Sequence, residues 1–104
     1  MNKDLIPLTH PGEHLLEMLE DYGLTQYRLA KELGIQQTRV MQIIKGERSI
    51  TADSAIRLGR FFGTSAEMWM NLQQHYDLEV AQRKIGLQVD QKITPLPAAR
   101  AIVN

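Results

Sequence analysis

The sequence contains no cysteine, so it has neither disulfide bonds nor thiolate metal sites, and this fits a protein of the reducing cytoplasm. No apolar run approaches the ~20 residues that a membrane-spanning helix needs, and the N-terminus shows no secretion signal. The 104 residues suffice for one compact domain with a single core. We therefore expect a single cytoplasmic domain with no membrane partner.

The chain also lacks the residue combinations that most enzymes need. It has no cysteine nucleophile, no glycine-rich phosphate-binding loop, and no paired carboxylates with a histidine in a plausible pocket. The one candidate metal cluster is His10, Glu13 and His14, whose two histidines are four residues apart. A Pro-Gly pair follows His10 and interrupts the continuous helix that such a site requires, so we interpret these histidines as helix-start and surface residues. We expect no enzymatic activity, metal, cofactor or small-molecule substrate.

The formal net charge is zero, which at first argues against a partner as anionic as DNA. The charges are unevenly distributed, however. Residues 1–33 contain three basic and six acidic side chains, whereas residues 34–60 contain five basic and two acidic ones. Positive charge therefore collects in the middle of the chain. A single copy would still bind DNA weakly, so we expect the protein to act as a homodimer.

The segment from Thr25 to Lys45 carries two short helical patterns joined by a glycine. Thr25 can cap the first helix, and Gly34 can adopt the left-handed backbone conformation of a tight turn. The small Ala30 lets the second helix approach, and Val40 fills the crossing point. This pattern predicts a helix-turn-helix packed through Ala30, Gly34 and Val40. The alternative is an ordinary helical hairpin in which these residues occur by chance.

The second helix of this pair has a polar outer face with little charge. In a helix-turn-helix, residues at the N-terminal end of the second helix reach base edges in the major groove. A glutamine amide donates and accepts at once, which matches the hydrogen-bonding edge of adenine. The predicted base contacts are Gln36, Gln37, Thr38 and Gln42. The predicted phosphate contacts are Gln26, Arg39, Lys45, Arg48 and Ser49.

Start and stop signals predict three more helices around this pair. The predicted starts are Pro11, Thr51 and the pair Thr64 and Ser65, and the predicted stops are Gly23, Gly63 and Ile85. Thr64 is followed three residues later by Glu67, as in a capping box. These signals divide the chain into an N-terminal arm at residues 1–10, a helical domain at residues 11–85, and a C-terminal tail at residues 86–104. In the tail Leu87, Val89 and Ile93 alternate as in a short strand, and a disordered tail is the alternative.

The last predicted helix carries more apolar residues than one stripe holds. We expect Trp69 to pack in the core, because it lies in the regular apolar period. A small domain cannot cover both flanks of a long helix, so the second flank is predicted to contact another subunit. The residues proposed for this dimer interface are Met70, Leu78, Ala81 and Ile85.

Two sets of sequence strings resemble known families. The segment LTQYRLAKELGIQQTRVMQIIKGERSIT resembles the helix-turn-helix of phage repressors of the Cro, cI or XRE type, which implies an all-α, five-helix, lambda-repressor-like fold. The strings HPGE, SITADSA and FFGTSAEMWMNLQ are more specific and resemble HigA-type antitoxins, also called plasmid-maintenance antidote or VapI-like proteins. This similarity runs from about His10 to Ile85 and leaves the C-terminal tail uncovered.

The resemblance implies an antitoxin of a type II toxin-antitoxin module. Such a protein would repress its own operon by binding palindromic operator DNA, with Gln36, Gln37, Thr38 and Gln42 on bases and Gln26 on a phosphate. It would also neutralise a HigB-like, mRNA-cleaving toxin, through a surface that no motif identifies. Two alternatives stay open. One is a stand-alone XRE-type regulator without a toxin, and the other is a module that binds a toxin but no DNA.

Overall fold

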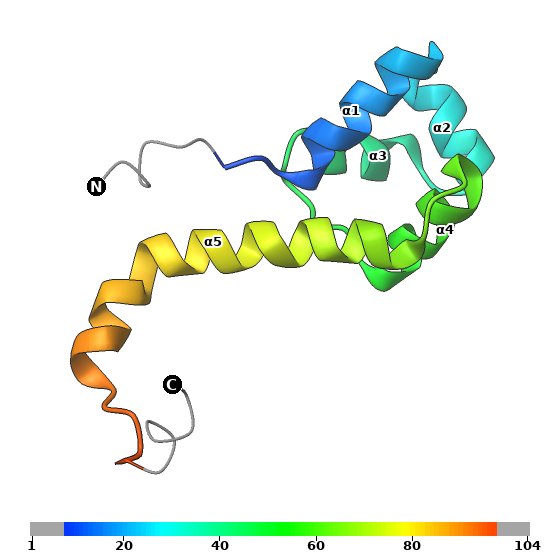
Figure 1. Cartoon of the computed structure of the whole chain (residues 1–104). Coiled ribbons are helices and arrows are strands. Elements are labelled where there is room, and N and C mark those ends of the chain that lie inside the picture. The colour runs from blue at the N-terminus through cyan, green and yellow to red at the C-terminus, as the bar shows by residue number, and fades with distance from the viewer. Residues whose placement is uncertain (1–7, 98–104) are drawn as a thin grey trace.

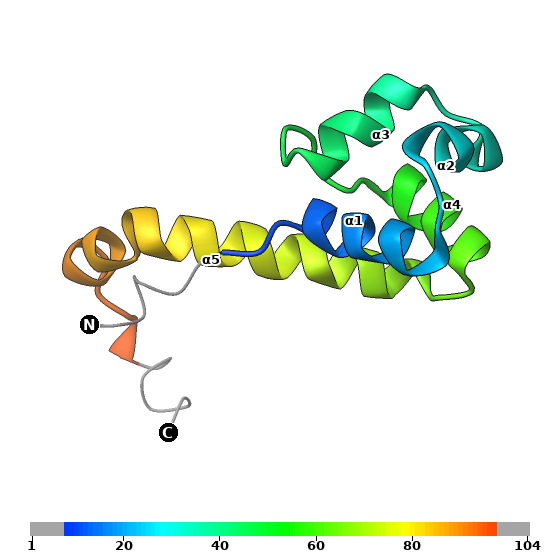
Figure 2. The same ribbon diagram turned by 90° about the horizontal axis from the view of Figure 1, so that it is seen from above.

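The computed structural model describes residues 8–97, and this part of the chain contains five helices and no strand. The helices are α1 (Pro11–Tyr22), α2 (Gln26–Leu33), α3 (Gln37–Ile44), α4 (Ala52–Phe62) and α5 (Ala66–Lys92). The first four helices and the start of α5 form a head, from which the rest of α5 extends as a stalk (Figure 1). Seen from above, α1 passes over the first half of α5, and α3 lies to one side of both (Figure 2). The predicted all-α, five-helix class is confirmed.

Most helix ends follow the predicted signals. The Thr25 and Thr51 hydroxyls accept hydrogen bonds from the backbone N–H groups of Arg28 and Ser54 and so cap α2 and α4. Glycines with left-handed backbones end α1, α2 and α4. The predicted start of α5 at Thr64 and Ser65 is confirmed for Ser65 and wrong for Thr64. Ser65 caps α5, because the Thr64 hydroxyl instead accepts a hydrogen bond from the indole of Trp69 at 2.9 Å.

The predicted end of the last helix at Ile85 is also wrong, since α5 continues to Lys92. Leu87 and Val89 are therefore helical, and no strand forms within residues 86–97. Extending an existing helix adds one hydrogen bond per residue, whereas an isolated strand has no neighbour to pair with. The last turns of α5 bend away from its earlier axis (Figure 1). The rest of the predicted tail, residues 98–104, lies outside the described residues.

His10 does not belong to a free arm, as the predicted boundary at residue 10 implied. Its side chain is 8% exposed, and its Nδ1 accepts a hydrogen bond from the Gly12 N–H at 2.9 Å, so His10 is the N-cap of α1. Burial lowers the pKa of His10, against the opposing charges of Asp77 and Glu13. A neutral imidazole suits this cap, because a protonated Nδ1 cannot accept. Residues 1–7 lie outside the described part.

The core joins all five helices around Trp69, which is fully buried as predicted. Leu15, Leu29, Ile43 and Leu58 contribute from α1 to α4. The buried amide of Gln73 on α5 accepts a hydrogen bond from the Ile50 N–H at 2.7 Å and donates to Asp77 at 2.9 Å. This contact fixes the loop between α3 and α4 onto α5. Within residues 8–97, no helix combines the length and apolar character needed to cross a membrane.

Gly34→Val should destabilise the protein by about 1–3 kcal/mol, because a β-branched residue would be strained at the observed φ of 70°. An added Cβ would meet only Arg57 Nη1 at 3.5 Å, so the loss would come from the backbone. Thermal unfolding followed by circular dichroism measures it, with an expected fall in Tm of roughly 4–8 °C per kcal/mol. Gly34→Asn is the control and should lose less stability than Gly34→Val, since asparagine tolerates this backbone conformation. Equal Tm values for Gly34→Val and the wild type would contradict the assigned turn.

Candidate nucleic-acid interface

The three residues predicted to pack the helix-turn-helix meet at the crossing of α2 and α3. Ala30 and Val40 are buried, and the left-handed Gly34 reverses the chain between the two helices. The N–H groups of Gly34 and Ile35 donate to the carbonyls of Lys31 and Ala30, which satisfies the end of α2. The local sequence therefore sets the angle at which α3 leaves the turn.

The N-terminal end of α3 is exposed on the head. Gln37 and Thr38 begin the helix with exposed side chains, and Gln36 stands before them as the N-cap residue. The Gln36 amide makes no capping hydrogen bond, so it stays available to a ligand. Gln42 is half-buried, and its Oε1 accepts a hydrogen bond from Arg48 Nε at 2.9 Å. Three of the four predicted base contacts are thus exposed, and the fourth is held by an arginine.

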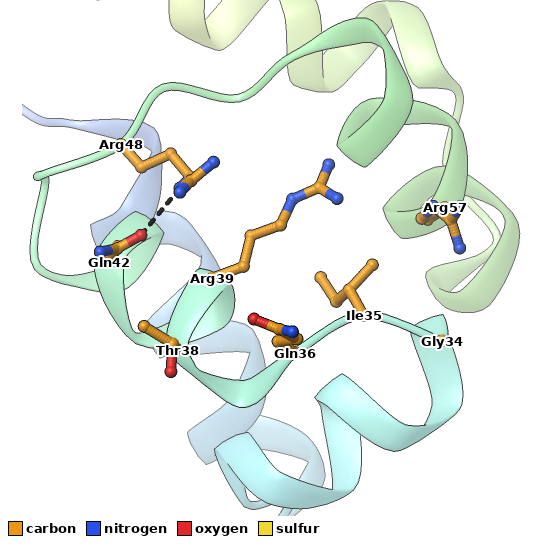
Figure 3. Close-up of a pocket in the computed structure, with 8 residues that line it drawn as sticks. All are labelled: Gly34, Ile35, Gln36, Thr38, Arg39, Gln42, Arg48 and Arg57. Carbon is orange, nitrogen blue, oxygen red and sulfur yellow. Dashed lines mark hydrogen bonds between the residues drawn. The ribbon is translucent and has the colours of Figure 1, made fainter.

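A hollow of about 530 Å³ lies beside this end of α3 (Figure 3). It is lined by Gly34, Ile35, Gln36, Thr38, Arg39, Gln42, Arg48 and Arg57. Three of these residues are arginines, which come from α3, the loop after it, and α4. The hollow therefore combines amide groups that can read bases with guanidinium groups that suit phosphate.

Asp53, in the first turn of α4, binds two of these arginines. Its Oδ1 accepts hydrogen bonds from Arg57 Nε and Arg39 Nη2, both at 2.8 Å. Arg57 Nη1 also donates to the Leu33 carbonyl at 2.8 Å and thereby links α4 to the end of α2. The hydrogen bonds from Arg57 and then Arg39 lower the pKa of Asp53, which stays ionised at neutral pH.

The other predicted phosphate contacts lie around the same face. Lys45, Arg48 and Ser49 are exposed at the C-terminal end of α3 and in the loop after it. Gln26 is the first residue of α2 and is half-buried. The structure thus distributes these side chains over α2, α3 and the loop before α4, where a DNA backbone would cross both helices of the pair.

The residues predicted for a dimer interface separate into two groups. Leu78, Ala81 and Ile85 are exposed and line one hollow of about 230 Å³ on α5, together with Gly86 and Val89. Met70 instead packs against the core of the head, because it lies on the part of α5 that α4 and α1 cover. The apolar surface that α5 itself leaves open therefore begins at Leu78.

The roles of Asp53 and Arg57 were missed in the sequence. Their spacing of four residues is that of a helical ion pair and was a usable signal. No sequence pattern predicts that Arg39 joins them from another helix. Among residues 8–97, no group of three or more His, Asp or Glu side chains is arranged to hold a metal ion.

A comparison with protein families matches residues 15–69 to the helix-turn-helix family HTH_3. The chain belongs to this family. Its relatives include virulence-associated protein I of Dichelobacter nodosus, which is 44% identical over 82 residues that cover 78% of this chain and 76% of that protein.

Solved structures of other helix-turn-helix proteins agree closely with this fold. An addiction module antidote protein of the HigA family from Coxiella burnetii is 44% identical and has a TM-score of 0.85 over 88% of this chain and all of that one. The Pseudomonas aeruginosa antitoxin HigA, solved with the higBA promoter, is 43% identical and has a TM-score of 0.83 over 86% of this chain and 99% of that one. The chain is therefore similar to HigA-type antitoxins, as its sequence strings predicted.

Proposed function

We propose that this protein is a DNA-binding antitoxin that represses its own operon. The observation that carries the proposal is the exposed N-terminal end of α3, whose free amides stand beside the arginine-lined hollow. The similarity to an antitoxin solved with its promoter supports the same reading. Binding operator DNA places the site of action in the cytoplasm.

In the proposed complex α3 lies in the major groove. Gln36, Gln37 and Thr38 contact base edges, and Gln42 contacts a base one turn later. The side chains that contact backbone phosphates, and so set the position of the helix, are Arg39, Lys45, Arg48, Ser49 and Gln26. Since the amides carry the base recognition and the cations carry the salt dependence, changes to the two groups should have separable effects.

We further propose that two copies bind a palindromic operator as a homodimer. One copy has zero net charge, so its overall electrostatic attraction to DNA would be weak. The exposed apolar surface on α5, made by Leu78, Ala81 and Ile85, supports pairing through the stalks. Pairing there leaves α3 of each copy free, because α3 lies in the head, whereas these residues lie on the stalk (Figure 1).

The antitoxin role adds a protein partner, a HigB-like toxin whose mRNA-cleaving activity this protein would neutralise. The proposed function consists of binding alone, with no catalytic step and no cofactor.

A stand-alone regulator is the second candidate, and one relative supports it. The HTH-type transcriptional regulator YbaQ of Escherichia coli is 38% identical over 77% of this chain and 72% of that protein. Co-expression with the product of the neighbouring gene decides between them, since only a toxin would arrest growth until this protein is supplied.

The double variant Gln37→Ala/Gln42→Ala tests the DNA-binding role. Each lost amide should cost about 1–3 kcal/mol of discrimination, so we expect the affinity for the DNA upstream of the gene to fall at least tenfold. Fluorescence anisotropy with this DNA and a scrambled duplex measures the change. Gln74→Ala, at an exposed position of α5, is the matched control. Unchanged preference for the upstream DNA in the double variant would contradict the assigned recognition surface.

A further inference from the structure

The carboxylate of Asp53 lies between two arginines that line the hollow of the face proposed to bind DNA. Asp53 Oδ1 accepts hydrogen bonds from Arg39 and Arg57, each at 2.8 Å, and the Asp53 side chain is 55% exposed. A negative charge here opposes the phosphate attraction that the surrounding arginines supply. Its position therefore calls for a reason other than affinity.

The two arginines held by Asp53 differ in their other contacts. Arg57 donates a second hydrogen bond to the Leu33 carbonyl and stays fixed between α4 and α2. The Arg39 side chain lines the hollow, and among the described residues Asp53 is the one hydrogen-bond partner of its guanidinium. The Arg39 side chain reaches from α3 toward α4 (Figure 3). Arg39 is thus the guanidinium that a phosphate could take over from Asp53 without breaking the fold.

We infer that Asp53 is a specificity-determining residue, which competes with DNA phosphates for Arg39. A carboxylate and a phosphate bind a guanidinium through the same charge-assisted hydrogen bonds. Nonspecific duplex DNA, bound by charge alone, gains less binding free energy from Arg39, because the Asp53–Arg39 pair must first be broken. The inference rests on the proposed DNA binding and extends it to the discrimination between operator and other DNA.

The competition from Asp53 should weaken binding to operator DNA less than it weakens binding to other DNA. The Asp53 pair holds Arg39 extended across the hollow, so a phosphate that arrives with α3 seated in the major groove meets a guanidinium already in place. This preorganisation offsets the cost of displacing Asp53. A scrambled duplex does not seat α3 in the groove, so its phosphates reach Arg39 without this alignment and the cost of breaking the Asp53 pair is not offset. The carboxylate is ionised at neutral pH, since both guanidinium hydrogen bonds lower the pKa of Asp53.

Asp53→Asn removes the charge and keeps the size of the side chain. We expect the affinity for a scrambled duplex to rise about five- to tenfold at low salt, and its salt dependence to steepen by about 0.9 in log–log slope, the value of one additional phosphate contact. The affinity for the upstream DNA should change less than about threefold, so the specificity ratio falls. Anisotropy titrations with both duplexes over a range of KCl concentrations measure all three quantities.

Two further variants make the result decisive. Glu17→Gln, at an exposed position of α1, removes the same charge away from this face and should leave the slope unchanged. Asp53→Asn/Arg39→Gln should return the slope on scrambled DNA to the wild-type value. An equal effect of Glu17→Gln, or a slope that stays steep in the double variant, would overturn the role of the Asp53–Arg39 pair.

A purely structural role predicts a different outcome. If Asp53 only fastens α4 to α3, Asp53→Asn lowers Tm and weakens binding to both duplexes, and the inference is overturned. If the wild type discriminates between the duplexes and Asp53→Asn leaves the ratio and slope unchanged, the inference fails and the proposed function stands. If the wild type itself does not prefer the upstream DNA, both fail.

Discussion

Gly12→Ala should lower the free energy of unfolding by about 3 kcal/mol, the upper end of the usual cost of overpacking a core. Gly12 is buried in the first turn of α1, where a Cβ would overlap the backbone carbonyl of Ile43 in α3 and lie 2.9 Å from Ile44 Cα. Backbone atoms cannot swing aside as a side chain does, so the two helices must separate. Urea unfolding followed by circular dichroism measures the loss.

The same substitution should also weaken DNA binding, because α1 supports α3 from behind. Gly86→Ala is the matched control for the stability measurement, since a Cβ there would meet only the flexible end of Gln82 at 3.2 Å. Alanine is a better helix former than glycine, so this control should be neutral or more stable by up to about 1 kcal/mol. A Gly12→Ala protein as stable as the wild type would show that α1 and α3 do not make this backbone contact.

The helix-turn-helix could be predicted from the sequence because its determinants are local. Thr25 and Gly34 act on backbone groups within a few residues of themselves, and the spacing of Ala30 and Val40 sets which side chains meet at the crossing. The exposure of Gln37 and Thr38 follows from the same helical period. None of these features depends on a contact with residues distant in the sequence.

Other features depend on residues that meet only after folding. Arg39 and Asp53 are fourteen positions apart, and Ile50 and Gln73 are twenty-three apart, so their hydrogen bonds follow from how α4 and α5 pack. The predicted arm includes His10 because its cap uses an imidazole nitrogen, which the usual N-cap preferences do not include. The predicted end of α5 lies too early because apolar alternation in a short segment does not distinguish a strand from a continuing helix.

Leu78→Gln/Ile85→Gln should convert the proposed dimer to a monomer and lower the affinity for the upstream DNA at least about 100-fold. Both side chains are exposed, at 60% and 48%, on one face of α5, and glutamine amides buried between two copies would lack partners. A monomer also loses the gain from linking two half-site contacts, which reaches about 10²–10⁴. Light scattering after gel filtration gives the mass, and anisotropy gives the affinity.

The choice of glutamine keeps the net charge constant, so a fall in DNA affinity cannot come from added repulsion. Leu87→Gln is the matched control, because Leu87 is 72% exposed on the same helix but lies about 200° around its axis from Ile85 at 100° per residue. We expect this control to stay dimeric and to bind as the wild type does. If Leu87→Gln breaks the dimer while Leu78→Gln/Ile85→Gln does not, the copies meet through the opposite face of α5. The two α3 helices would then be presented to DNA with a different spacing, because the half-site separation follows from which faces of the stalks pair.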